Sequence, residues 1–125
     1  SGTIFRPGSM RRISSGPTRR MPGSPEVLYV LTGKDAPGSL ATRRAVRAEH
    51  LARVQVLLEA GRIVIAGPCP AVDSPDPGEA GFTGSVIIAE FASLEAARDW
   101  LAGDPYVTAG VFESYEARPF IKVLP

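Results

Sequence analysis

The sequence has few of the residues that build disulfides, metal sites and membrane spans. It contains one cysteine, Cys69, and one histidine, His50. A single cysteine excludes an intrachain disulfide, and one cysteine with one histidine cannot form a structural zinc site. No apolar run approaches the roughly 18 residues that a membrane-spanning helix needs, and no P-loop or dinucleotide-binding motif is present. We therefore expect a globular protein of the reducing cytoplasm with no metal, no cofactor and no membrane partner.

Acidic residues are scarce at one end of the chain. The whole sequence holds 14 basic and 13 acidic residues, but residues 1–25 contain five of the arginines and no acid. Residues 26–125 therefore keep nine basic and 13 acidic residues, a net charge near −4. Contacts with phosphates supply most of the affinity for nucleic acids, so a negatively charged domain is a poor nucleic-acid binder. No nucleic-acid partner is expected for residues 26–125.

Residues 1–25 also differ from the rest in composition, because they are rich in Ser, Gly, Pro and Arg. Such a segment buries too little apolar surface to offset its ordering entropy, so we predict a flexible basic tail. Three interpretations stay open: a cloning remnant joined to a native tail, a basic arm that touches anions, or an acid-free transit peptide. The folded domain is predicted to occupy residues 26–125.

The remaining sequence predicts strands and helices in the order β-α-β-β-α-β. Strands are predicted at residues 26–33, 62–67, 84–91 and 111–118, with a short tail strand at 120–124. One helix is predicted at 40–60, with Ser39 as its N-cap and Gly61 just past its end, and another at 94–102 with Ser93 as its N-cap. This order is typical of the ferredoxin-like sandwich, an α+β fold in which a four-stranded antiparallel sheet carries both helices on one face.

The single histidine falls on the side of the first predicted helix that should face the core. Arg43 and Arg47 make the same face basic in its N-terminal half. Arginine is almost never fully buried unless it is paired, so this half is expected to line a cleft for an anionic group. Two alternatives stay open: His50 is a satisfied core residue, or the arginines lie on a solvated shoulder and pair with acids such as Glu49 or Asp35.

The turn after the second predicted helix brings a carboxylate to the same end of the sheet. Right-handed crossovers place Asp104 beside the N-terminal half of the first helix. A carboxylate that accepts one imidazole N–H fixes the tautomer and leaves the other nitrogen for proton transfer. His50 and Asp104 are therefore candidates for a catalytic pair, although an aspartate before a proline is also a common turn.

A proline-rich loop is predicted at this end as well. Residues 68–81 (PCPAVDSPDPGEAG) hold four prolines, and long loops are often functional. Ordinary turn chemistry is the alternative for its polar residues. Besides the two arginines, the candidate substrate contacts at this end of the fold are Gly67, Pro68, Asp73, Ser74 and Tyr106.

Four motifs resemble the YciI-like, or YCII-related, family. They are R-x-x-H-L in the first helix, A-G-P before the loop, G-F-T-G-S into the third strand and D-P-Y-x-x-A-G before the fourth. The resemblance implies a dimeric α+β barrel, in which two sheets pack face to face across a two-fold axis. It also implies a His–Asp active site that maps onto His50 and Asp104, and a likeness to a relative in chloroaromatic degradation that is regarded as a dehydrochlorinase.

Three functional hypotheses follow. In the first, His50 is a general base and acid, Asp104 orients it, and Arg47 with Arg43 holds an anionic or enolate oxygen of a small anionic or aromatic substrate. Proton abstraction with elimination or isomerisation is the chemistry that these residue types favour. The alternatives are a small-molecule-binding module without turnover and a structural dimerisation domain in which Asp104 merely satisfies His50.

Overall fold

The computed structural model describes residues 27–125, which form one sheet and one layer of helices. The strands are β1 (Leu28–Asp35), β2 (Ile63–Pro70), β3 (Phe82–Glu90) and β4 (Phe112–Phe120). The helices are α1 (Leu40–Glu59), α2 (Leu94–Ala102) and α3 (Pro105–Thr108), with a 3₁₀ turn, η1 (Gly78–Ala80), before β3. The tail predicted at residues 1–25 lies outside the described residues.

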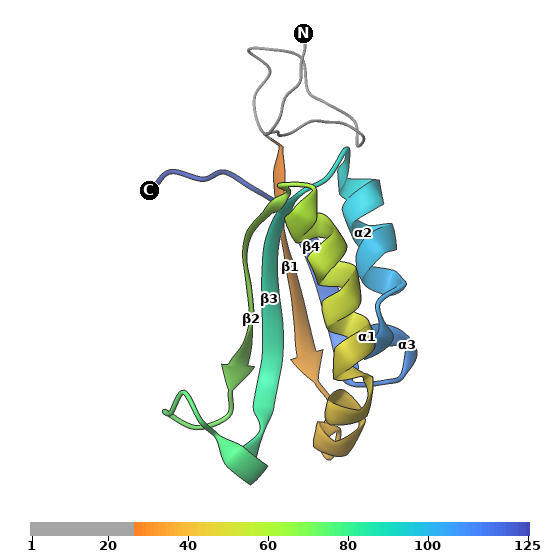
Figure 1. Ribbon diagram of the computed structural model, residues 1–125, viewed down its shortest axis with the longest axis vertical. Coiled ribbons are helices and arrows are strands. Elements are labelled where there is room, and N and C mark those ends of the chain that lie inside the picture. Colours follow the sequence, from red (N-terminus) through yellow and green to blue (C-terminus); the bar gives the residue numbers. More distant parts are fainter. Residues whose placement is uncertain (1–26) are drawn as a thin grey trace, which may run out of the picture.

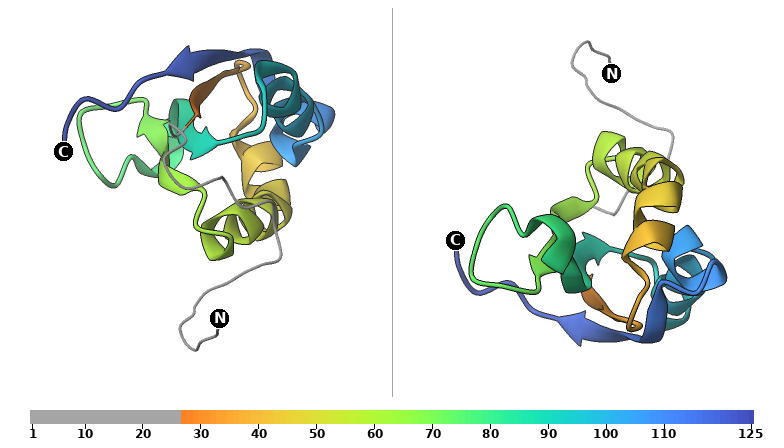
Figure 2. Two further views of the ribbon diagram at one scale, coloured as in Figure 1. Left: turned by 90° about the horizontal axis from the view of Figure 1, so that it is seen from above. Right: turned by 90° about the horizontal axis from the view of Figure 1, so that it is seen from below.

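The strands are antiparallel to their neighbours and follow the order β2-β3-β1-β4. The described helices cover one face of the sheet and leave the other face open (Figure 1), as the end-on views also show (Figure 2). Because β1 and β2 both pair with β3, they run in the same direction, and both end near the first turns of α1. This arrangement confirms the predicted α+β ferredoxin-like sandwich.

The predicted end of α1 and the predicted start of α2 are both confirmed. Gly61 has a φ of 73°, and its N–H donates to the carbonyl of Leu58 at 2.9 Å. The N–H of Arg62 donates to the carbonyl of Leu57 at 2.9 Å, which completes a Schellman cap. At α2, the Ser93 hydroxyl accepts the first-turn N–H of residue 96 at 3.0 Å.

The predicted N-cap position of Ser39 is confirmed, but its side chain does not cap the helix. Ser39 does precede α1, but its hydroxyl donates to the carbonyl of Ala36 at 2.7 Å and makes no cap hydrogen bond to the helix. The side chain therefore closes the turn that leads into α1 instead of satisfying the free N–H groups of the first turn.

Three predicted strand boundaries need correction. β1 runs past Gly33 to Asp35, because Lys34 still pairs with both neighbouring strands. Gly33 itself lies under the ring of Phe112, where a Cβ would come within 2.3 Å of a ring carbon. β2 continues through Pro68 to Pro70, which an edge strand tolerates because one side of its backbone pairs with nothing in the sheet. The tail strand at 120–124 is absent, since β4 ends at Phe120 and residues 121–125 form no strand.

The hydrophobic core fills the space between the sheet and the helices. Alternate residues of β1 and β3 point toward the helices, and they include Leu31 and its partner Ile87. Leu57 from α1 and Leu101 from α2 close the core from the other side. The core is thus apolar at the end where α1 finishes, and polar side chains enter it only toward the N-terminal half of α1.

Candidate active site

His50 and Asp104, the two residues predicted to pair, are in direct contact. The Nδ1 atom of His50 lies 2.8 Å from Oδ2 of Asp104. Both residues are buried, with exposed fractions of 9% and 1%. Asp104 is the N-cap of α3, where the same oxygen accepts the N–H of Tyr106 at 3.0 Å. The cap fixes the carboxylate of the α2–α3 turn against the middle of α1.

The surroundings of Asp104 keep its carboxylate ionised. Burial alone would raise the pKa of Asp104, but the hydrogen bonds from His50, from the Tyr106 N–H and from Arg53 lower the pKa below its ordinary value. An ionised carboxylate only accepts hydrogen bonds, so Nδ1 of His50 must carry a proton. In the neutral imidazole, Nε2 then holds the free lone pair.

Arg53 is a part of this site that the sequence interpretation missed. Its Nη1 donates to Oδ1 of Asp104 at 2.9 Å, and its Nη2 donates to the carbonyl of Trp100 at 3.0 Å. The guanidinium also lies 4.3 Å from the centre of the Trp100 ring. Arg53 stands three residues after His50 on α1, and side chains at this spacing share a helix face, so the spacing could have revealed it.

Tyr106 forms one wall of the site. Its ring stacks on the imidazole of His50 with a centroid distance of 4.0 Å and an interplanar angle of 13°. Burial raises the pKa of Tyr106 and outweighs the lowering effect of the Arg43 and Arg47 charges, so the phenol stays protonated at neutral pH. The stacked ring restrains the plane of His50, while Asp104 fixes which nitrogen is protonated.

Arg43 pairs with Asp35, one of the two acids that the alternative interpretation named, but the pair is buried and does not lie on a solvated shoulder of the helix. Its Nε and Nη2 donate to the two carboxylate oxygens of Asp35, each at 2.8 Å, and Nη2 also donates to the hydroxyl of Ser85 at 2.9 Å. Burial would lower the pKa of Arg43, but the hydrogen bonds and charge of Asp35 raise it above the ordinary value. The charge of Arg43 is therefore compensated within the protein.

A pocket of about 190 Å³ opens between the N-terminal half of α1 and strands β2 and β3. Since Nδ1 of His50 is engaged by Asp104, Nε2 is the nitrogen left for a molecule in this pocket. Arg47 is exposed and forms no hydrogen bond or ion pair with any residue in 27–125, so it is a free cation at the pocket. The predicted site residues that line the pocket are Arg43, Arg47, His50, Gly67, Pro68 and Tyr106.

Asp73 and Ser74, predicted as substrate contacts, do not line this pocket. The Ser74 hydroxyl instead accepts the N–H of Asp76 at 3.1 Å, which is ordinary turn chemistry. The physical reason is the length of β2: the strand continues to Pro70, so the first part of the following loop lies away from the helix layer (Figure 1). The loop returns to α1 only at its end, where Glu79 pairs with Arg44.

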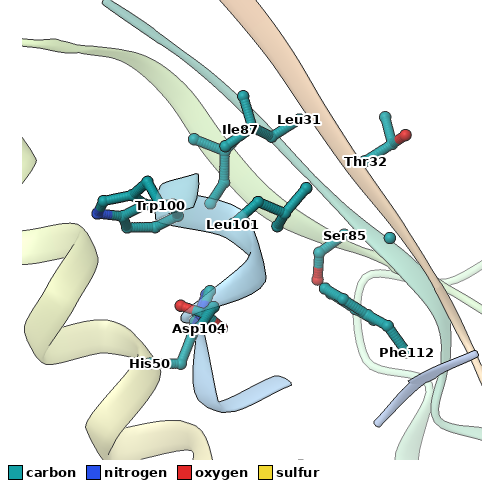
Figure 3. A pocket seen from close by; sticks show the side chains of 10 residues that line it. Leu31, Thr32, His50, Ser85, Ile87, Trp100, Leu101, Asp104 and Phe112 are labelled. Atoms are coloured by element: carbon teal, nitrogen blue, oxygen red, sulfur yellow. The ribbon is translucent and has the colours of Figure 1, made fainter. Parts of the chain in front are cut away.

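A smaller space lies deeper, between His50 and the sheet (Figure 3). Its volume is about 10 Å³, close to what one water molecule needs. Ser85 borders both this space and the larger pocket, and the sequence interpretation assigned it no role. The one signal in the sequence is that Ser85 is the last residue of the G-F-T-G-S motif, which carries the family resemblance.

Comparison with protein families identifies the group to which this chain belongs. The model of the YCII-related domain matches residues 27–121. The chain belongs to the YCII-related family. This membership confirms the resemblance that the four sequence motifs indicated.

Two relatives of high similarity align with this chain over nearly their whole lengths. Protein YciI of Escherichia coli is 58% identical over 97 residues, which are 78% of this chain and 99% of the relative. A Haemophilus influenzae protein is 52% identical over 95 residues, which are 76% of this chain and 97% of the relative. The YCII-related domain is thus the part of the chain that these relatives share.

A solved structure provides the chemical comparison. It is 5-chloro-2-hydroxyhydroquinone dehydrochlorinase (TftG) from Burkholderia phenoliruptrix, in complex with 2,5-dihydroxybenzoquinone. The two chains superimpose with a TM-score of 0.66 and 28% identity, over 76% of this chain and 94% of TftG. The YCII-related fold of this chain is therefore also the fold of an enzyme that binds a small ring compound.

Two further findings describe the YCII-related domain in residues 27–125. These residues contain no group of three or more His, Cys, Asp or Glu side chains that could hold a metal ion. None of the helices in this part of the chain is both long and apolar enough to cross a membrane.

Proposed function

We propose that this protein is a small-molecule enzyme that uses general acid–base chemistry. His50 transfers protons through Nε2, and Asp104 orients the ring and stabilises the imidazolium that forms. The observation that carries this proposal is the 2.8 Å contact between Nδ1 of His50 and the ionised Asp104, in a histidine that lines the pocket of about 190 Å³. A hydrogen bond of this kind selects the tautomer in which Nε2 can accept a proton.

The pocket favours a small, anionic or aromatic substrate. A cavity of about 150 Å³ is enough for benzene, so the pocket of about 190 Å³ suits a single substituted ring. The free guanidinium of Arg47 attracts a carboxylate, phenolate or enolate oxygen at its mouth. TftG, which shares the fold, acts on a chlorinated hydroxyhydroquinone and binds 2,5-dihydroxybenzoquinone, and this supports hydroxylated rings as the first compounds to test.

The reaction that fits these groups is proton abstraction followed by elimination or isomerisation. Nε2 of His50 removes a proton, the electron pair delocalises onto a substrate oxygen near Arg47, and the imidazolium returns the proton or an anionic group leaves. General acid–base catalysis of this kind contributes about 10²–10⁴-fold in rate. His50 moves the proton and Arg47 stabilises the charged substrate oxygen in each step of this reaction.

The experiment compares the wild type with His50→Gln and Asp104→Asn on 5-chloro-2-hydroxyhydroquinone and related hydroquinones, by chloride release and quinone absorbance. We expect His50→Gln to lower turnover by about 10²–10⁴-fold and Asp104→Asn to lower it as well, because the tautomer is no longer fixed. Glu49→Gln is the matched control on α1, since Glu49 is exposed and does not line the pocket.

Two other outcomes would replace the proposal. Binding without turnover of any compound would favour a small-molecule-binding module. If neither turnover nor binding is found, and ¹⁵N shifts of His50 do not respond to any ring compound, a structural role for the His50–Asp104 pair would be favoured.

We also propose that two copies associate through the open face of the sheet to form a homodimer, the dimeric α+β barrel that the family resemblance implies. The support is a row of side chains that point away from the helices, including the paired Val30 and Ile88. Ile65 on β2 pairs with Ile88 and is 60% exposed. An apolar sheet face of this kind is stabilised when a second surface covers it.

A further inference from the structure

Ser85 is a buried hydroxyl on the part of the sheet that faces the pocket. It is 8% exposed and lies on β3 between Gly33 of β1 and Pro68 of β2. The next two residues on the same face of β3, Ile87 and Ala89, belong to the hydrophobic core. A hydroxyl at such a position requires hydrogen-bond partners, because an unpaired buried polar group is costly.

Arg43 supplies one partner and fixes the direction of the hydrogen bond. A guanidinium only donates, so the Ser85 oxygen accepts the bond from Nη2 at 2.9 Å. Arg43 cannot turn away easily, because Asp35 holds it at two atoms and both side chains are 5% exposed. The lone pair of Ser85 that faces Arg43 is thus occupied, and its proton must point elsewhere.

The proton of Ser85 has no acceptor among residues 27–125. What the side chain does face is open space, since Ser85 lines both the pocket of about 190 Å³ and the small space behind His50. Figure 3 shows Ser85 on the sheet side of that space and His50 with Asp104 on the helix side. The unsatisfied donor and the imidazole therefore border the same cavities from opposite layers.

We propose that Ser85 donates its hydroxyl hydrogen to an oxygen of the bound substrate, and that the Asp35–Arg43 pair is the positioning group that aims this donor. The inference rests on the proposed function and specifies its substrate class: a compound whose carbonyl or phenol oxygen becomes an enolate or phenolate oxygen when His50 removes a proton. Ser85 keeps its own proton throughout, so it stabilises the oxygen without entering the proton balance. Arg43 then acts through Ser85, while Arg47 provides the free charge.

The first experiment measures binding of 2,5-dihydroxybenzoquinone by isothermal titration calorimetry. The Ser85→Ala variant should bind the quinone about 10- to 100-fold more weakly than the wild type, because it loses a hydrogen bond to a charged oxygen. Ser114→Ala is the matched control, because Ser114 is exposed on β4 and lies outside the pocket, and its affinity should equal that of the wild type. Equal affinity of Ser85→Ala and wild type would overturn the proposal.

The second experiment needs no ligand. In a Cys69→Ala background, Ser85→Cys places a thiol where the hydroxyl stands, and thiolate absorbance near 240 nm is followed against pH. The Arg43 guanidinium should lower the pKa of this thiol below its ordinary value of about 8.5, and iodoacetamide should alkylate it through the pocket. A serine that is closed off in the core predicts no alkylation, so access of iodoacetamide is the result that separates the two roles. An inaccessible thiol, or one with an ordinary or raised pKa, would overturn the role of Ser85.

The two experiments separate this inference from the proposed function. If the wild type binds the quinone and turns over substrate while Ser85→Ala does the same, only the inference fails. If the thiol is accessible and acidified but no ring compound binds or reacts, the aimed donor is supported and the proposed substrate class fails.

Discussion

Three donors converge on the carboxylate of Asp104. Nδ1 of His50 and the N–H of Tyr106 bind one oxygen, and Arg53 binds the other. The sequence predicted the partnership with His50 from two sources: the topology that brings the turn after α2 to α1, and the family resemblance. It did not predict Arg53, since an arginine on a helix is most simply a solvated side chain, and its target lies 51 residues away in the sequence. The sequence thus revealed the His50–Asp104 pair but not the arginine that supports its carboxylate.

Replacement of Arg53 should destabilise the fold more than replacement of a surface arginine. Arg53→Ala leaves Oδ1 of the buried Asp104 without its donor, which costs about 1–3 kcal/mol in the free energy of unfolding. Arg44→Ala is the matched control on the same helix, because the Arg44–Glu79 pair is exposed and such pairs contribute about 0–1 kcal/mol. Urea unfolding measures both. Equal losses would show that Asp104 does not depend on Arg53.

The lowered pKa of Asp104 predicts a particular loss of stability in acid. Because the pKa is lower in the folded protein than the ordinary value near 4, Asp104 contributes stability that is fully present above about pH 4. This contribution is lost as the pH falls through the folded-state value. Asp104→Asn cannot titrate, so its deficit in unfolding free energy relative to the wild type should be largest at pH 7 and should shrink below pH 4. A deficit that stays constant from pH 7 to pH 3 would contradict the prediction.

At the scale of elements, α1 combines two kinds of surface on one buried stripe. Its buried residues are Arg43, His50 and Leu57, each seven positions after the last. The sequence interpretation recognised this change from polar to apolar, because helical periodicity depends only on local spacing. It placed His50 correctly at the border between the core and the pocket.

Strand boundaries were harder to predict, because they depend on where a strand lies in the sheet. Gly67 and Pro68 look like a strand end, yet they continue β2 because β2 is an edge strand. Gly33 looks like a stop, yet it lies under the ring of Phe112, a residue 79 positions later. Neither fact is visible in a local window of sequence. By contrast, Asp104 followed by Pro105 is a helix start, and this local signal for α3 was interpreted only as a turn.

At the scale of the whole molecule, the described residues leave one surface that the fold itself does not cover. The residues that follow β4 extend from the sheet on the side away from the helices (Figure 1). Ile121, Val123 and Leu124 in this segment are each more than 80% exposed. Together with Ile65 on the open face, they place apolar area on the side where the proposed partner would lie. The strand and helix pattern of the sequence predicted that the helices cover one face of the sheet. The prediction that a second copy covers the other face came only from the family resemblance.

The homodimer predicts that charge on the open sheet face should separate the copies without unfolding the chain. Light scattering at micromolar concentration should give the wild type twice the chain mass of 13.2 kDa. Ile88→Lys places a buried charge from each copy in the proposed interface, so this variant should have the mass of one chain. Val56→Lys is the matched control, because Val56 is 65% exposed on α1 and should leave the dimer intact. A wild type with the mass of one chain, or an Ile88→Lys variant that remains dimeric with a native circular dichroism spectrum, would contradict association through this face.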